Sequence, residues 1–212
     1  MFVRNSFQFR LCPTKAQAKL LKEKLDECRW LYNELLSQRR LSHEELDLSL
    51  SKYQQLMFLP LLEEERPSLK IVHSQVLPNI VNRLDKAFQS FFRRCKAGKK
   101  PGFPRFCGMH LYDSFCYPQS GFALLGKEIS LSKMGRIRIK MHRSVDGELK
   151  TCTIKKTAAG EWDISLPCEV RAVPLKPKTE AIAVDVGIES FATFRMGRRL
   201  KIPDFSKRER KP

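Results

Sequence analysis

The sequence predicts an α+β fold in which an N-terminal strand and a later group of strands flank a helical segment. Three observations predict it. Residues 2 to 11 alternate between apolar and polar side chains, which is typical of a β-strand. Apolar residues then recur at three- and four-residue steps to about residue 95, which is typical of helices. From about residue 112 the chain shows short alternating segments between turns, and these predict a small antiparallel barrel or sandwich.

The helical segment should begin just after Cys12-Pro13, where Thr14 and Gln17 match a capping box. In that motif each side chain bonds a backbone amide that the first helical turn leaves free. A second capping box at Ser42 and Glu45 predicts a second helix, which should end near Pro60. The apolar faces of these two helices would consist of Leu21, Leu25, Cys28, Tyr32 and Leu35, and then Leu46, Leu50, Tyr53 and Met57.

A third helix should run to about Cys95, with a restart or a kink between Ser74 and Pro78, because proline bends a helix interior. After Cys95 the segment K-A-G-K-K-P-G-F-P-R-F-C is rich in glycine, proline and cations, which indicates a loop. The third helix would bury Ile80, Leu84, Ala87, Phe88, Phe91 and Phe92.

Net charge is the strongest compositional signal. The 212 residues include 40 Lys and Arg against 23 Asp and Glu, a formal charge of +17. Such a field attracts polyanions and favours nucleic acid as a partner over a merely solubilising surface. The strand Arg136–Met141 alternates strictly, so its cations should share one face. Candidate phosphate-binding residues are Arg136, Arg138, Lys140 and Arg143 of this region and Lys99, Lys100 and Arg105 of the loop.

Two aromatic residues, Phe103 and Phe106, flank Arg105 in the loop. Such rings can stack on nucleic-acid bases, but we expect them to anchor the loop in the core. For the cations, the alternative is a solvated face that keeps the protein soluble.

Cysteine and histidine usage indicates neither a disulfide framework nor a zinc site. The seven cysteines are odd in number with none at C-x-x-C spacing, and the four histidines are dispersed. No apolar stretch approaches the roughly 18 residues of a membrane span, and the N-terminus lacks the apolar core of a signal peptide. We therefore expect a soluble cytoplasmic protein with reduced thiols and no membrane partner.

Asp185 stands out near the C-terminus, after a predicted linker around residues 171 to 180. It lies in A-I-A-V-D-V-G, a strand apolar on both faces, with a glycine two residues later. A carboxylate fixed on a rigid strand can hold a hard cation such as Mg²⁺. Three interpretations stay open: a turn aspartate, the first metal ligand of an RNase H-like nuclease, or the phosphate-site aspartate of an actin-like ATPase. The last does not explain the net charge.

Several longer pieces of the chain carry a family resemblance. In order they are F-R-L-C-P-T-K-A-Q (Phe9 to Gln17), C-R-W-L-Y-N (Cys28 to Asn33), L-D-K-A-F-Q-S-F-F-R-R (Leu84 to Arg94), G-K-K-P-G-F-P-R-F (Gly98 to Phe106), L-S-K-M-G-R-I-R-I-K-M-H-R (Leu131 to Arg143) and the V-D-V-G-I block. Over essentially the whole chain this set resembles the TnpB/OrfB proteins of bacterial insertion sequences, relatives of the type V CRISPR effectors.

The resemblance implies a domain organisation. A wedge-like antiparallel β-barrel would comprise residues 1–12 and 112–172, and an inserted helical recognition domain, with the basic loop, would comprise residues 13–111. A linker at 173–180 would lead to the first strands of a RuvC (RNase H-like) nuclease domain at 181–212.

The resemblance also implies a function. Guide RNA and target DNA would be the partners of a transposon-associated, RNA-guided DNA endonuclease, and Asp185 would be its first catalytic, Mg²⁺-binding carboxylate. The family's other carboxylates and its zinc ribbon lie further along than Pro212. We therefore expect a chain truncated before its nuclease site is complete and inactive alone. The alternative is a catalytically inactive nucleic-acid-binding remnant or repressor.

Overall fold

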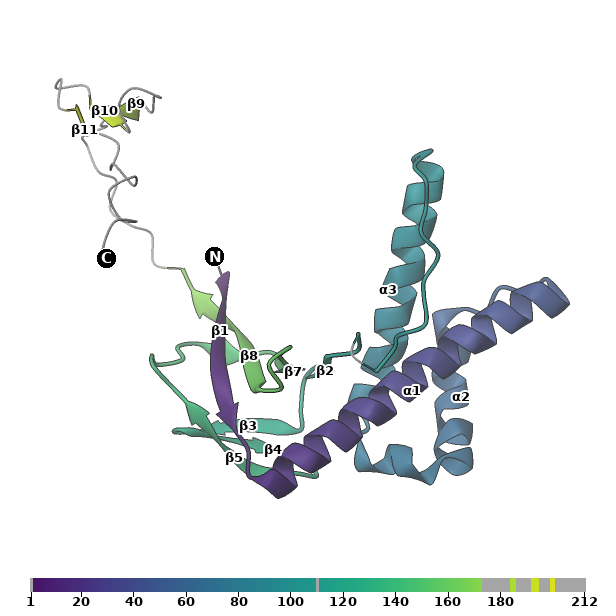
Figure 1. Ribbon diagram of the computed structural model, residues 1–212, viewed down its shortest axis with the longest axis horizontal. Coiled ribbons are helices and arrows are strands. Elements are labelled where there is room, and N and C mark those ends of the chain that lie inside the picture. The colour runs from purple at the N-terminus through teal and green to yellow at the C-terminus, as the bar shows by residue number, and fades with distance from the viewer. Residues whose placement is uncertain (1, 110, 173–183, 186–191, 195–198, 201–212) are drawn as a thin grey trace, which may run out of the picture. The chain divides into compact units, whose positions relative to one another are not determined.

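The computed structural model divides the chain into two compact units, Met1–Ala172 and Val173–Pro212 (Figure 1). It describes residues 2–109 and 111–172 of the first unit and three short strands of the second. The first unit combines a curled antiparallel sheet with three α-helices and one 3-10 helix. Its helical elements are α1 (Lys15–Leu46), α2 (Lys52–Glu65), η1 (Pro67–Ile71) and α3 (Val76–Lys96).

The sheet has eight strands in the order β2-β7-β8-β1-β5-β4-β3, with β6 paired to β8. The N-terminal strand is central: it pairs with β8 from Phe2 to Leu11 and with β5 from Arg10 to Cys12. The strands are β1 (Phe2–Cys12), β2 (Ser114–Tyr117), β3 (Phe122–Leu125), β4 (Glu128–Leu131), β5 (Gly135–Lys140), β6 (Glu148–Leu149), β7 (Cys152–Lys156) and β8 (Trp162–Arg171).

The predicted α+β class and the predicted group of antiparallel strands are confirmed. The sheet is a half-barrel, because β2 and β3 end its order without pairing to each other among the described residues. Its buried face follows the predicted alternation. Each such side chain contributes about 1.5–3 kcal/mol when fully buried. The buried face includes Phe9, Leu11, Ile129, Leu131, Ile137, Ile139, Ile154, Ile164 and Leu166.

The predicted start of α1 is confirmed in detail. Thr14 caps the helix by accepting from the Gln17 amide, and the Gln17 side chain accepts from the Thr14 amide. The predicted apolar stripe is buried along the helix. Lys24 interrupts that stripe and is itself fully buried, and it donates to the carbonyl of Ile71 at 2.7 Å. This bond satisfies a carbonyl at the end of η1, which explains how a lysine is tolerated there.

The predicted capping box at Ser42 and Glu45 is wrong. Both residues lie within α1, which continues to Leu46 and ends where Asp47 adopts a left-handed conformation (φ 51°). Residues 38–46 contain neither glycine nor proline, so an established helix extends through them at little cost. The next helix starts nine residues later than a cap at Ser42 would place it: Ser51 and Gln54 form the capping box of α2.

The predicted end of that helix at Pro60 is also wrong, since α2 runs to Glu65 with Pro60 inside it. Proline in a helix interior costs about 3 kcal/mol. Burial of Leu59 and Leu62 on either side of it offsets that cost. The predicted apolar face is shifted as well, because Tyr53 and Met57 are 72% and 76% exposed.

The predicted restart before Pro78 is confirmed. Helix α3 begins at Val76, so Pro78 occupies its first turn, where no backbone donor is needed. Its buried residues end at Phe88, and Phe92 in the later turns is half exposed, contrary to prediction. The helix ends in a Schellman motif: Gly98 has φ 63°, its amide bonds Cys95, and the Lys99 amide bonds Arg94.

The described residues of the second unit form three short antiparallel strands in the order β11-β10-β9. Asp185 lies in β9 (Val184–Asp185) opposite Thr193 of β10 (Ala192–Phe194), and β11 is Arg199–Leu200. The remaining residues of the predicted strand, the linker 173–180 and residues 201–212 lie outside the described residues. The assignment of this unit to a RuvC-like domain therefore stays a prediction.

Candidate nucleic-acid interface

The clearest basic surface is a row of three exposed cations on β5. Arg136, Arg138 and Lys140 point away from the core, while Ile137 and Ile139 between them are buried. Alternate side chains of a strand are about 6.8 Å apart. In one strand of a nucleic-acid duplex, successive phosphates are about 3.4 Å apart along the helix axis. The cation spacing is roughly twice that value, so the row can contact phosphates along one strand. We call these three residues the β5 cation row.

The β5 cation row keeps its charge available. None of its members forms an ion pair within the described part of the chain, although Glu128 lies opposite Arg138 on β4. Arg10, the cross-strand partner of Lys140, behaves differently. It pairs with Glu161 and with Asp163, the latter at 3.0 Å, and these partners raise the pKa of Arg10.

The start of α1 is fastened to the β5 cation row. The amide nitrogen Nε2 of Gln17 donates to the carbonyl of Arg136 at 2.8 Å, while the oxygen of the same side chain closes the capping box. One glutamine thus links the helical layer to the strand that carries the row. Because both of its polar atoms are bonded, the backbone at Arg136 has a fixed position relative to α1.

A second basic surface is the loop after α3, in which Lys99, Lys100 and Arg105 are exposed. Both ends of the loop are held. Arg94 donates to the carbonyl of Gly102 at 3.1 Å. The Asn33 side chain exchanges two hydrogen bonds, of 2.8 and 3.0 Å, with the backbone of Cys107. The loop runs beside α3 in Figure 1, so it lies on the helical layer rather than on β5.

Sequence reasoning missed the cations that extend this second surface. Arg93, Arg94 and Lys96 are exposed on the last turns of α3, immediately before the loop. Cations at a helix C-terminus also interact favourably with its macrodipole. The signal was present in the run R-R-C-K-A-G-K-K, which joins the helix end and the loop into one basic stretch.

Arg143 does not belong to the β5 cation row. Its guanidinium carbon lies 4.8 Å from the centre of the Phe7 ring. Phe7 shares a sheet face with Phe9 and Leu11, the face on which Ile139 is buried. Arg143 therefore lies apart from the other three cations, because its side chain covers an aromatic ring on the opposite face, and its contact with phosphates stays a prediction.

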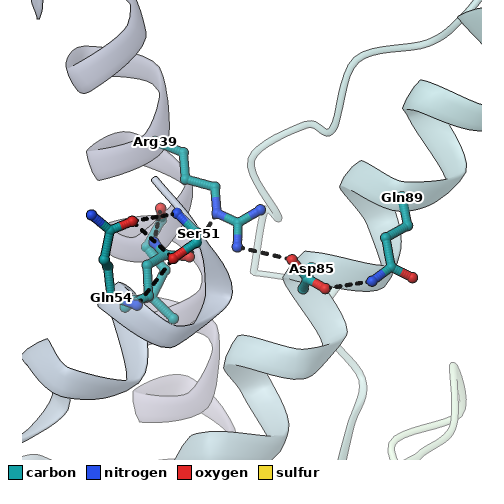
Figure 2. Close-up of polar contacts among 7 residues, drawn as sticks. Arg39, Ser51, Gln54, Asp85 and Gln89 are labelled. Atoms are coloured by element: carbon teal, nitrogen blue, oxygen red, sulfur yellow. Dashed lines mark hydrogen bonds and ion pairs between the residues drawn. The ribbon is translucent and has the colours of Figure 1, made fainter. Parts of the chain in front are cut away.

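A buried polar network joins the three helices (Figure 2). Arg39 of α1 donates to Gln55 of α2 at 2.7 Å and to Asp85 of α3 at 3.2 Å. Gln55 donates in turn to the carbonyl of Leu35, and Gln89 donates to Asp85 at 2.6 Å. The sequence carried one signal for it: Arg39 continues the three- and four-residue spacing of the buried stripe.

The candidate Mg²⁺ site is not described beyond the backbone of Asp185. The described residues contain no group of three or more His, Cys, Asp or Glu side chains that could hold a metal ion. One strand-borne carboxylate gives too few oxygens for Mg²⁺, so no metal-dependent step is derived from this structure. In the described part, no helix is long and apolar enough to cross a membrane.

One family model matches the start of the chain. The HTH_OrfB_IS605 family model, described as a helix-turn-helix domain, matches residues 1–46. In the structure these residues form one strand and one uninterrupted helix, so the description does not match their fold here.

Two curated relatives match nearly the whole chain. A candidate RNA-guided DNA endonuclease of Streptomyces pristinaespiralis is 27% identical over 221 residues, covering 98% of this chain and 52% of the relative. A candidate RNA-guided DNA endonuclease of Escherichia coli K12, InsQ, is 28% identical over 213 residues, covering 97% and 51%. The chain thus spans about half the length of the curated relatives it matches.

A solved structure shares the fold. The cryo-EM structure of the Cas12f1-sgRNA-target DNA complex superimposes with a TM-score of 0.53 at 10% identity, covering 96% of this chain and 57% of the other.

These features define an α+β protein in which helices are inserted between the first strand and the rest of a curled antiparallel sheet, with exposed rows of cations. The chain is similar in sequence to two curated RNA-guided DNA endonucleases, and its first 46 residues match a family model of OrfB proteins.

Proposed function

We propose that this chain supplies the guide-RNA- and target-DNA-binding part of an RNA-guided DNA endonuclease of the TnpB type. The observation that carries the proposal is the β5 cation row, whose three charges stand unpaired on a described surface of the sheet. The names of the two relatives support the nuclease over a catalytically inactive remnant. The domain limits expected from the family, with a recognition domain at 13–111, belong to the same proposal.

The cations of the β5 row and of the loop after α3 would hold the nucleic acid, while another interaction reads its sequence. Lysine and arginine contacts to phosphates position a nucleic acid without reading its sequence. In a guided complex, base pairing between RNA and DNA reads the sequence. Rows of unpaired cations on rigid elements are therefore sufficient for the role that we assign to residues 2–172.

The test is to purify the chain from cells, sequence the RNA that remains bound, and measure binding of duplex DNA complementary to that RNA. We expect one RNA species to be enriched and DNA binding to require complementarity. A protein that retains no defined RNA, or that binds scrambled and complementary DNA equally, would contradict the proposal.

We further propose Asp185 as the first Mg²⁺-binding carboxylate of the nuclease. Its support is its place on β9 in the V-D-V-G sequence. Asp185→Asn should remove whatever guide-dependent, Mg²⁺-dependent cleavage the protein shows, while RNA binding stays within twofold of the unsubstituted chain. Cleavage that persists in the variant would exclude Asp185 from the metal site.

A further inference from the structure

A cleft of about 850 Å³ opens on the helical layer, between the end of α1, the last turns of α3 and the basic loop. Ligand sites commonly have volumes of about 300–1,000 Å³. Phe88 and Phe103 line it together with Phe106, and Arg40 and Arg105 contribute cations. The aromatic rings of this cleft are partly exposed to solvent, so they forgo part of the free energy that full burial would provide.

The floor of the cleft is built rigidly. Arg39, which lines it, is held by the buried network to Gln55 and Asp85, and its guanidinium carbon lies 4.8 Å from the centre of the Phe88 ring. The bonds to Gln55 and Asp85 draw together all three helices (Figure 2). An arginine held at both of these bonds gives the Phe88 ring a fixed neighbour, while the ion pair with Asp85 offsets its charge.

The walls present aromatic faces. Phe103 packs in T-shaped contacts against Phe88 and Phe91, with ring centroids 5.5 and 5.3 Å apart, yet it remains 43% exposed. Phe106 is 47% exposed. We expected both rings to anchor the loop in the core. Phe103 does so in part, through its contacts with Phe88 and Phe91, while Phe106 remains about half exposed. The Arg40 guanidinium carbon lies 6.0 and 5.5 Å from the two ring centres.

The charges around the cleft favour an anion at its rim. Glu44 also lines the cleft and pairs with Arg40 at 3.4 Å, which neutralises one cation. Arg105 is exposed at the rim, and Lys99 and Lys100 follow on the same loop. The surplus is positive, so the expected occupant combines a flat apolar group with a negative group.

We propose that this cleft binds the base of an unpaired nucleotide, which stacks on Phe106 and Phe103 while Arg105 and the loop lysines contact the neighbouring phosphates. Every base has a π-face, so stacking of this kind is sequence-tolerant. A base within a duplex presents only its edges, so the cleft selects single-stranded segments. The proposal rests on the proposed function, and it adds a surface that senses whether the nucleic acid is paired.

The test uses the full chain and a twelve-nucleotide (CA)₆ strand, as RNA and as DNA, with affinity measured by fluorescence anisotropy. Loss of one base–aromatic stack corresponds to about five- to 150-fold in affinity. Phe106→Ala and Phe106→Leu should each weaken binding by that factor for both sugars, since stacking needs no 2′-hydroxyl. Because the change is not ionic, the dependence of affinity on salt should stay the same.

Two controls isolate the stacking. Tyr53→Leu removes an aromatic ring that is 72% exposed on α2 and outside the cleft, and it should leave affinity unchanged. A strand of abasic residues should bind the unsubstituted chain and Phe106→Leu equally. The proposal is overturned if Phe106→Leu binds (CA)₆ as tightly as the unsubstituted chain. It is also overturned if Phe106→Leu weakens binding of the abasic strand by the same factor as binding of (CA)₆. Failure of the unsubstituted chain to bind any strand would instead refute the proposed function.

Discussion

Cys28 illustrates how a single buried group makes stability depend on pH. It is fully buried in α1, and burial raises the pKa of its thiol to about 12 from an ordinary value near 9. Above pH 9 the unfolded chain releases this proton while the folded chain keeps it, so stability falls between pH 9 and 12. The slope is at most about 1.4 kcal/mol per pH unit. Urea unfolding from pH 8 to 10.5 should show a shallower decline for Cys28→Ala, and parallel curves would contradict the assignment.

Arg39 and Arg66 allow a buried arginine to be compared with a more exposed one. The Arg39 side chain is 8% exposed, whereas the Arg66 side chain, paired with Glu27 at 2.7 Å, is 38% exposed. Arg39→Ala leaves the buried oxygen of Gln55 without its donor and leaves part-buried Asp85 with Gln89 alone, and we expect a loss of about 3 kcal/mol. Arg66→Ala should cost less, about 1–2 kcal/mol, because water reaches the arginine end of the pair although Glu27 itself is 12% exposed. Equal losses in chemical denaturation would show that the network in Figure 2 does not brace the helices.

At the scale of elements, His73 connects the helical layer to the sheet. It accepts from the Gln75 amide at 3.3 Å, and a methyl group on Gly121 would lie 2.8 Å from its ring. Burial, and then the positive charges of Lys133 and Lys24, lower the pKa of His73 below its usual 6.5. As pH falls through 6.5 the unfolded chain takes up a proton first, so stability falls. Thermal unfolding between pH 7.5 and 5.5 should show this loss, and His73→Gln should reduce it.

The elements also show what the sequence could predict. Side-chain patterns were decisive where one local rule acted alone, as at the Thr14–Gln17 box and along β5. They failed where two rules competed. Ser42 could cap a helix, but it lies inside the continuing helix α1, where its carbonyl accepts from the Asp47 amide at the helix end. Pro60 could end a helix, but burial of its neighbours outweighed the lost hydrogen bond.

For the whole molecule, chain order predicted the α+β class because local alternation and helical spacing report on each element separately. The cleft and the Arg39 network were not predictable in the same way. They depend on how α1, α2 and α3 pack. The spacing of Arg39 marks it as a buried position, but no local pattern identifies Gln55, Asp85 or Phe103 as its neighbours. The interpretation of Asp185 as a metal-binding carboxylate stays a prediction from its sequence motif, because the structure describes only the backbone of its strand.

The central claim is that the β5 cation row binds phosphates, and the most direct test is the salt dependence of RNA affinity. Replacing Arg136, Arg138 and Lys140 together with Gln should weaken binding without unfolding the sheet, because Ile137 and Ile139 stay in the core. The matched control replaces Lys22, Lys52 and Lys70, which are exposed or half-exposed on the helical layer, and removes the same charge elsewhere.

Each duplex phosphate contact contributes about −0.9 to the slope of log affinity against log salt, and each single-stranded contact about −0.7. The measurement is that slope for the RNA that co-purifies with the protein. Our account predicts a steep slope for the unsubstituted chain, a slope shallower by about 2 to 3 for the β5 variant, and little change for the control. Equal slopes for the β5 variant and the control, or a flat slope for the unsubstituted chain, would contradict it.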